Sequence, residues 1–277
     1  MEDNWFTMCR NFSSKGVNNL TSYTDFDYLC NEPFFVPNIG NLKCPTLKEI
    51  RKITHNMFLL YINIISSTPD GYLKLCGKEE EFNSLPESEK EKLSLYTLLL
   101  YGNTGILMGL MSTFVADEVL FDKDNLSFVV CRGEGETKKQ IGCINNDNFD
   151  EFRNEVLKIL GMKQIETKKP KYKTERARLL AEKIKKAKAQ LPKTASYNEN
   201  MALDNMIKKY CTHNKVGINI LNVWDMTYYQ FIHMFNEYCN GRQCDYSDMI
   251  AANTFSYKEA SDYKSMLWIE KLNNNTD

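Results

Sequence analysis

Several features that often reveal an enzyme are scarce or missing in this sequence. Its 277 residues include only three histidines, and no Gly-x-Ser-x-Gly elbow or similar nucleophile signature accompanies them. Gly133-Glu-Gly135 lacks the third glycine and the Lys-Ser/Thr of a phosphate-binding loop. A formal net charge of −1 excludes a general attraction of the whole protein to nucleic acid or anionic membranes. These absences favour a protein that is not an enzyme and that uses no cofactor.

Long apolar runs and targeting segments are also absent. The longest apolar run, Met57–Ile65, is well short of the roughly 20 residues that a membrane span needs, so we interpret it as part of a core helix. The first residues, Met1-Glu-Asp-Asn, lack the basic and then apolar pattern of a secretory signal. Nine cysteines without regular spacing indicate free thiols in a reducing cytoplasm. We expect a cytoplasmic protein without membrane contact.

Helical periodicity dominates what is present. Hydrophobic residues make up 43% of the chain and charged residues 26%, which is typical of a globular protein. The pattern predicts a mainly α fold with a small β-hairpin, hence the α+β class. Expected elements are a strand or hairpin in 33–43, a helix capped by Thr46 and Glu49 and continuing to about Ser66, a turn at Thr68–Gly71, helices over 86–100 and 106–119 with a break at Gly102–Gly105, a hairpin near 126–144, and a helix after Asn148.

The stretch Ile218–Tyr238 carries the clearest local signal. Thr227 and Gln230 have the spacing of a capping box, which predicts the start of a helix. An aromatic face follows at helical spacing, and it fits either a domain core or a protein interface, where Trp and Tyr are enriched. The candidate partner-binding residues are Trp224, Tyr228, Phe231, Phe235 and Tyr238. Asn240-Gly241 predicts a turn before a further helix near Tyr246–Asn253.

A shift in composition suggests how the chain is divided. Lys163–Lys193 contains twelve Lys or Arg and three acids, a local charge of +9, so the rest of the chain sums to about −10. We therefore expect a helical N-terminal domain over 1–162, a basic helical connector over 163–195, and a helical C-terminal module over 196–277.

The basic connector has two interpretations. It can be a solvated helix between domains, or it can bind nucleic acid through phosphate contacts made by Lys183, Lys185, Lys186 and Lys188. Tyr172 is the one aromatic residue in the stretch, so base stacking is poorly served. The first interpretation is favoured.

One set of residues has the ligand types of a zinc site. Cys211, His213, Cys239 and Cys244 offer thiol and imidazole groups. Their Cys-x-His and Cys-x4-Cys spacings match no common zinc finger. Buried core thiols are the favoured interpretation, and zinc binding is left open.

The order of parts resembles a known family. The segments that carry the resemblance are Pro37–Ile50, the hairpin with the helix start Ile144–Arg153, the Lys-rich connector, and Asn222–Phe231 with a helical end that closes on Trp268. Together they look like tail assembly chaperones and minor tail proteins of tailed phages and prophages of Gram-positive bacteria. The abundance of Cys and Met departs from that family's pattern.

The resemblance implies a role in phage tail morphogenesis without catalysis. Such a protein would act in the host cytoplasm through helical hydrophobic surfaces, shielding the tape-measure protein and helping tail-tube subunits polymerise around it. Self-association is a further expectation of this kind. One alternative is a structural component retained in the virion, and another is a nucleic-acid-binding protein that uses Lys163–Lys193.

Overall fold

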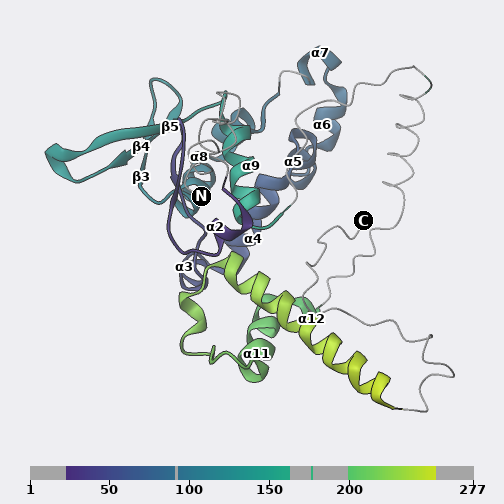
Figure 1. Cartoon of the computed structure of the whole chain (residues 1–277). Coiled ribbons are helices and arrows are strands. Elements are labelled where there is room, and N and C mark those ends of the chain that lie inside the picture. Colours follow the sequence, from purple (N-terminus) through teal and green to yellow (C-terminus); the bar gives the residue numbers. More distant parts are fainter. Residues whose placement is uncertain (1–22, 91–92, 163–175, 177–198, 254–277) are drawn as a thin grey trace, which may run out of the picture. The chain divides into compact units, whose positions relative to one another are not determined.

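The computed structural model describes residues 23–90, 93–162, 176 and 199–253 (Figure 1). These residues form a mainly α fold with two small antiparallel sheets, so the α+β class expected from the sequence is confirmed. The chain divides into two compact units. Unit 1 comprises Met1–Pro45 and Ser67–Gly161, and unit 2 comprises Thr46–Ser66 and Met162–Asp277. The chain therefore enters unit 2, returns to unit 1, and later enters unit 2 again.

Unit 1 combines helices with both sheets. Its helices are α2 (Asp25–Tyr28), α5 (Pro69–Leu75), α6 (Glu79–Ser84), α7 (Glu87–Lys90), α8 (Leu95–Phe114) and α9 (Phe149–Ile159). Its strands are β1 (Phe34–Val36), β2 (Gly40–Leu42), β3 (Glu118–Asp122), β4 (Ser127–Arg132) and β5 (Lys139–Ile144). Thr68 caps α5 by accepting from the Gly71 N–H, so the prediction of a simple turn at Thr68–Gly71 is wrong. Thr-Pro is also a helix-start signal.

The larger sheet has the strand order β3-β4-β5. The predicted hairpin is confirmed as β4 and β5, which pair antiparallel with Phe128 opposite Ile144. The sequence prediction missed β3, because it extended the preceding helix to 119. In the structure α8 ends at Phe114, and β3 pairs with β4 with Val119 opposite Val130.

The strand or hairpin predicted in 33–43 is a hairpin of β1 and β2, and its turn packs closely on β5. The Cys143 N–H donates to the Asn38 carbonyl at 2.8 Å. A Cβ atom added at Gly142 would overlap the carbonyl of Ile39 and approach the nitrogen of Gly40 to 2.8 Å. Residue 142 must therefore be glycine for the turn to approach β5 this closely.

Helix α8 lies at the core of unit 1. Within the described ranges it is the helix that is long and apolar enough to cross a membrane by length and composition. Its chain kinks at Asn103, in the predicted break at Gly102–Gly105, and Leu99, Leu107 and Phe114 are fully buried. These buried side chains belong to the core of unit 1, whereas Tyr101 of the same helix is 74% exposed and 39% of the apolar window is buried.

Unit 2 is built from two stretches of chain that are far apart in the sequence. Its elements are α3 (Leu47–Ile53), α4 (His55–Ser66), the 3-10 turn η3 (Glu199–Met201), α11 (Leu203–His213), the 3-10 turn η4 (Val223–Asp225) and α12 (Tyr228–Ala252). The single helix expected up to Ser66 is split at Thr54, where φ is +74°. Helix α12 runs through Asn240-Gly241, so the turn predicted there is wrong.

Both predicted capping boxes of unit 2 are present, and they lie next to each other. Thr46 caps α3 with Glu49, and Thr227 caps α12 with Gln230. The two threonines form an isolated antiparallel bridge, and the Leu47 N–H donates to the Met226 carbonyl at 2.9 Å. The start of α3 is thereby fixed beside η4 and the start of α12.

Residues 47–66 belong to the predicted N-terminal domain by sequence order, yet they cluster with unit 2. The predicted connector over 163–195 lies outside the described residues except for Arg176, which is exposed. The candidate basic residues Lys183, Lys185, Lys186 and Lys188 lie outside them as well.

Candidate protein-binding surface

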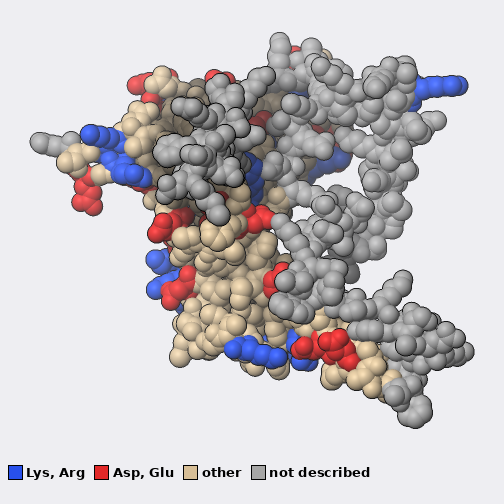
Figure 2. All heavy atoms as spheres, viewed as in Figure 1, with Lys and Arg blue, Asp and Glu red and all other residues tan. Residues whose placement is uncertain are grey.

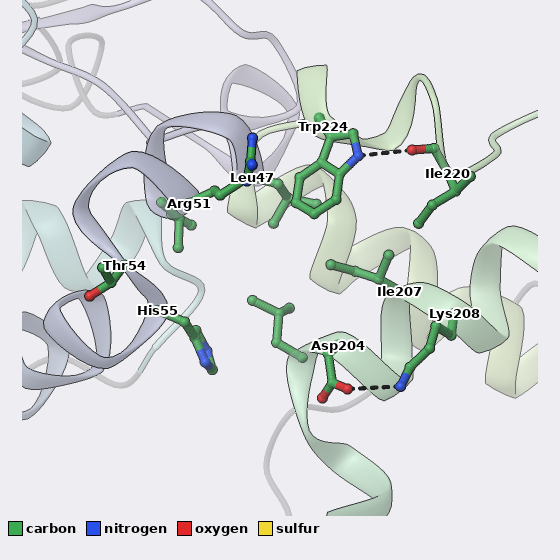
Figure 3. A pocket seen from close by; sticks show the side chains of 11 residues that line it. Leu47, Arg51, Thr54, His55, Asp204, Ile207, Lys208, Ile220 and Trp224 are labelled. Atoms are coloured by element: carbon green, nitrogen blue, oxygen red, sulfur yellow. Dashed lines mark hydrogen bonds and ion pairs between the residues drawn. The ribbon is translucent and has the colours of Figure 1, made fainter.

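A largely apolar pocket opens on unit 2, with a volume of about 430 Å³ (Figure 3). Its apolar lining comes from three places in the chain: Leu47 and Ile50 of α3, Leu203 and Ile207 of α11, and Ile220 with Trp224. The bridge between Thr46 and Thr227 accounts for this meeting, because it holds α3 against η4. We call this hollow the Trp224 pocket.

The indole of Trp224 is held in place on the pocket wall. Its Nε1–H donates to the Ile220 carbonyl at 2.8 Å, as Figure 3 shows. Trp224 itself is half-buried, so part of the ring is open to solvent. A tryptophan with its N–H satisfied and its ring part-exposed is a typical anchor of protein interfaces.

The loop before Trp224 is fixed by three asparagines, and we call it the Asn loop (214–222). The Asn214 Oδ1 accepts from the N–H groups of Val216 and Ile218 at 3.1 and 3.2 Å. The Asn219 Oδ1 accepts from the Leu221 N–H at 2.9 Å. The Asn222 side chain accepts from the Asn219 N–H at 2.7 Å and donates to the Gly217 carbonyl at 3.2 Å. Side chains thus replace secondary structure in satisfying this loop's backbone.

The Asn loop displays large apolar side chains to solvent. Leu221 is 85% exposed, Val216 61% and Ile220 50%. The asparagine hydrogen bonds fix the backbone of the loop, so the loop does not need to bury these side chains in order to be structured. Ile220 also lines the Trp224 pocket, and exposed apolar side chains beside a pocket are typical of a protein-binding site. Figure 2 shows uncharged areas on one face of the described surface with Lys, Arg, Asp and Glu between and around them, and the exposed residues of α3 itself, Lys48, Arg51 and Lys52, are basic.

Charged groups stand at the rim of the Trp224 pocket. Asp204 and Lys208, one turn apart on α11, form an ion pair of 2.8 Å, drawn dashed in Figure 3. The Lys208 ammonium holds the pKa of Asp204 below its usual value. Arg51 of α3 and His55 of α4 line the opposite side of the pocket. The rim is therefore polar around an apolar floor, the anatomy of many interfaces.

The predicted aromatic face divides between core and surface. Phe231 and Phe235 are 0% and 6% exposed, and they belong to the core of unit 2. The ring of Tyr210 from α11 meets Phe231 edge-on at 5.9 Å and Tyr238 at 5.8 Å. Tyr228 is half-buried and meets Phe58 of α4 edge-on at 5.1 Å. Among the five candidates, Trp224 is the one that lines the pocket.

The four candidate zinc ligands do not gather into a site. In the described ranges, which include all four, no three His, Cys, Asp or Glu side chains come together in a way that could hold a metal. Burial raises the pKa values of Cys211 and Cys239, which disfavours the thiolate that binds zinc. Cys244 is buried. Cys239 is exposed and Cys211 is half-buried, so among these three thiols Cys244 is the one with the buried position expected of a core cysteine.

The C-terminal part of the chain has a family match. Residues 192–273 match the model of the YomV second domain. This is a phage- and prophage-associated family, so the similarity connects this part of the chain with phages. No curated protein and no solved structure matches the chain. The match includes α11, the Asn loop and Trp224, whereas the α3 wall of the pocket comes from residues outside it.

Sequence reasoning missed the exposed side of this surface. The pattern of Ile218–Tyr238 indicated a short apolar run ahead of the helix, but it carried no prediction of how exposed that run is. Asn214, Asn219 and Asn222 with Gly217 between them are turn formers, and their density was the signal of a hydrogen-bonded loop. The contribution of Leu47 and Arg51 depends on a contact between distant parts of the chain, which no local pattern indicates.

Proposed function

We propose that this chain is a non-enzymatic interaction protein of phage tail morphogenesis, similar to tail assembly chaperones, acting in the cytoplasm of the bacterial host. It binds the tape-measure protein or the tail-tube protein through the Trp224 pocket and the exposed side chains of the Asn loop. The observation that carries the proposal is this exposed apolar surface within a segment that matches a phage-associated family. The resemblance of the chain's order of parts to tail assembly chaperones supports the choice of partner.

The chemistry of the surface suits a chaperone-like role. Each Å² of apolar surface that a partner covers contributes roughly 25 cal/mol, before the costs of association. Leu221 and Ile220 are already exposed in a fixed loop, so binding requires little further ordering of the protein. The same surface can cover apolar segments of a partner that would otherwise aggregate.

Co-expression tests the proposal. The full chain carrying an affinity tag is expressed with the tape-measure and tail-tube proteins of its source genome, and captured complexes are identified by mass spectrometry. We expect co-purification of one of them, and we expect Leu221→Ser and Trp224→Ala to reduce it at least tenfold. Leu75→Ser is the matched control, because Leu75 is also an exposed leucine (64%) but lies on α5 of unit 1.

The outcomes separate cleanly. Failure of every tail protein to co-purify with the wild-type chain contradicts the proposed partners. Equal losses from Leu221→Ser and Leu75→Ser contradict the assignment of the surface. Mass spectrometry of purified virions decides between a chaperone that leaves the particle and a structural component that stays in it.

The charge of Lys163–Lys193 motivates a second candidate, nucleic-acid binding. Each phosphate contact releases counterions, so such binding would weaken steeply with salt. A chain in which Lys183, Lys185, Lys186 and Lys188 are changed to Glu would then lose affinity for a DNA or RNA duplex. Absent or salt-independent binding by the wild-type chain removes this candidate.

A further inference from the structure

We propose that the Trp224 pocket and Asn loop receive an amphipathic helix whose apolar residues are flanked by carboxylates. This inference rests on the protein-binding role proposed above and adds the chemistry of the bound segment. It identifies Arg51 as the residue that selects for acidic flanks. The shape of the surface and the charge of its rim each support one half of the inference.

The shape calls for several apolar side chains at regular spacing. The pocket floor is formed by Leu47 and Ile207, on two different helices, and its volume of about 430 Å³ is larger than one side chain fills. Ile220 lines the pocket, and the neighbouring Leu221 extends the apolar surface onto the loop. A helix that presents residues at i, i+3, i+4 and i+7 can place several apolar side chains on such a surface along one face.

The charge of the rim selects the flanks. Two lining side chains are cations, Arg51 and Lys208, and one is an anion, Asp204. Asp204 and Lys208 neutralise each other in their ion pair. Arg51 is exposed, and among the described residues its guanidinium has no ion-pair partner. Glu49, the nearest acid on α3, accepts from the Thr46 N–H in its capping box.

A carboxylate on the partner therefore satisfies Arg51, and a lysine there meets an uncompensated positive charge. Guanidinium and carboxylate groups pair through two parallel hydrogen bonds, which gives the contact direction as well as energy. The rim thus discriminates by charge, while the apolar floor supplies affinity.

Three synthetic helical peptides test the inference with the full-length protein. The first carries Leu at i, i+3, i+4 and i+7 with Glu on the flanks. The second replaces every Glu with Lys, and the third keeps Glu but replaces every Leu with Ser. Dissociation constants are measured by calorimetry at low and physiological salt. We expect the Leu/Glu peptide to bind at least tenfold more tightly than either of the others.

Charge reversal identifies the selecting residue. Arg51→Glu should weaken binding of the Leu/Glu peptide about tenfold and strengthen binding of the Leu/Lys peptide. Lys52→Glu is the matched control, because it makes the same charge change at the next exposed position of α3 but does not line the pocket. Both changes place an acid in the last turn of α3 and share any effect on folding. Arg51→Gln removes the positive charge without introducing a negative one, and so measures the loss of the ion pair alone.

Each outcome bears on a different part of the inference. A Leu/Lys peptide that binds as tightly as the Leu/Glu peptide overturns the acidic flank. Equal dissociation constants for the Leu/Glu peptide and the peptide with Ser in place of Leu overturn the apolar docking itself. Equal effects of Arg51→Glu and Lys52→Glu overturn the assignment to Arg51. The peptides contain no phage sequence, so the peptide-binding result and the tail-protein co-purification are independent. A failure of either experiment leaves the result of the other valid.

Discussion

Thr46 and Thr227 pair as neighbouring residues of an antiparallel bridge, although most of the chain separates them. Each is also the N-cap of a helix and part of its own capping box. Two helices of unit 2 therefore start at one point, and the backbone there is held by side chains as well as by the bridge. This shared start places Leu47 and Arg51 of α3 beside Trp224, and so builds the pocket.

Removing the Thr227 hydroxyl should destabilise unit 2. In Thr227→Val the Gln230 N–H loses its acceptor at 3.1 Å in a buried position. We expect the free energy of unfolding to fall by about 1–2 kcal/mol, the usual worth of a lost N-cap. Urea denaturation followed by circular dichroism measures the change. Thr212→Val, at an exposed position on α11, is the matched control and should change it by less than about 0.5 kcal/mol.

Two glycines should respond oppositely to alanine. Gly142→Ala places a Cβ against the Ile39 carbonyl, so the β1–β2 turn must move, at a cost of about 1–3 kcal/mol or more. Gly241→Ala meets no atom within 4 Å inside α12, and should stabilise by up to about 1 kcal/mol. Thermal unfolding of both variants checks the pair. A harmless Gly142→Ala would contradict the packing of the turn on β5.

Core and surface residues of unit 2 should separate stability from binding. Phe235→Ala removes a buried ring and should cost about 3–5 kcal/mol of stability. Leu221→Ser changes an exposed side chain and should leave the unfolding midpoint almost unchanged while it weakens partner capture. Denaturation and co-purification are measured on both proteins. A Leu221→Ser variant that unfolds as easily as Phe235→Ala would place Leu221 in the core.

Alkaline pH should weaken unit 1 through Tyr96. Burial raises the pKa of Tyr96 to about 12, from a usual value of 10.0. Between these values the unfolded chain has released this proton and the folded chain still holds it, so the free energy of unfolding falls as pH rises. Below pH 10 the contribution is fully present.

Tyr96→Phe removes this titration. Its free energy of unfolding should decline less steeply between pH 10 and 12 than that of the wild type, although it also loses the hydrogen bond to the Leu126 carbonyl at 2.7 Å. Urea denaturation at several pH values measures both slopes. Parallel declines of the two proteins would show that another group is responsible.

Local signals in the sequence predicted local structure well. Both capping boxes and the β4–β5 hairpin were found where their residues indicated, because a cap or a tight hairpin depends on residues a few positions apart. Asn240-Gly241 misled the prediction. A glycine inside a helix costs about 1 kcal/mol relative to alanine. The continuous hydrogen bonding of α12 outweighs this cost and the local preference for a turn.

The candidate site could be predicted only in part. Trp224 was identified as a member of the aromatic face that recurs at helical spacing. Leu47 and Arg51 were not, because their side of the pocket depends on the bridge between Thr46 and Thr227. The aromatic periodicity of Phe231 and Phe235 favoured a core but also fitted an interface, and packing against Tyr210 of α11 distinguishes the two.

The division of unit 2 between two stretches of chain has a consequence for its synthesis. Helices α3 and α4 leave the ribosome more than a hundred residues before α11, and ribosomes add roughly 5–20 residues per second. For about ten seconds or more after their synthesis, the helices that complete the unit of Leu47, Ile50 and Phe58 have not yet been made. During this time the nascent chain carries α3 and α4 without the rest of unit 2. A fragment restricted to residues 192–273 would lack these two helices altogether.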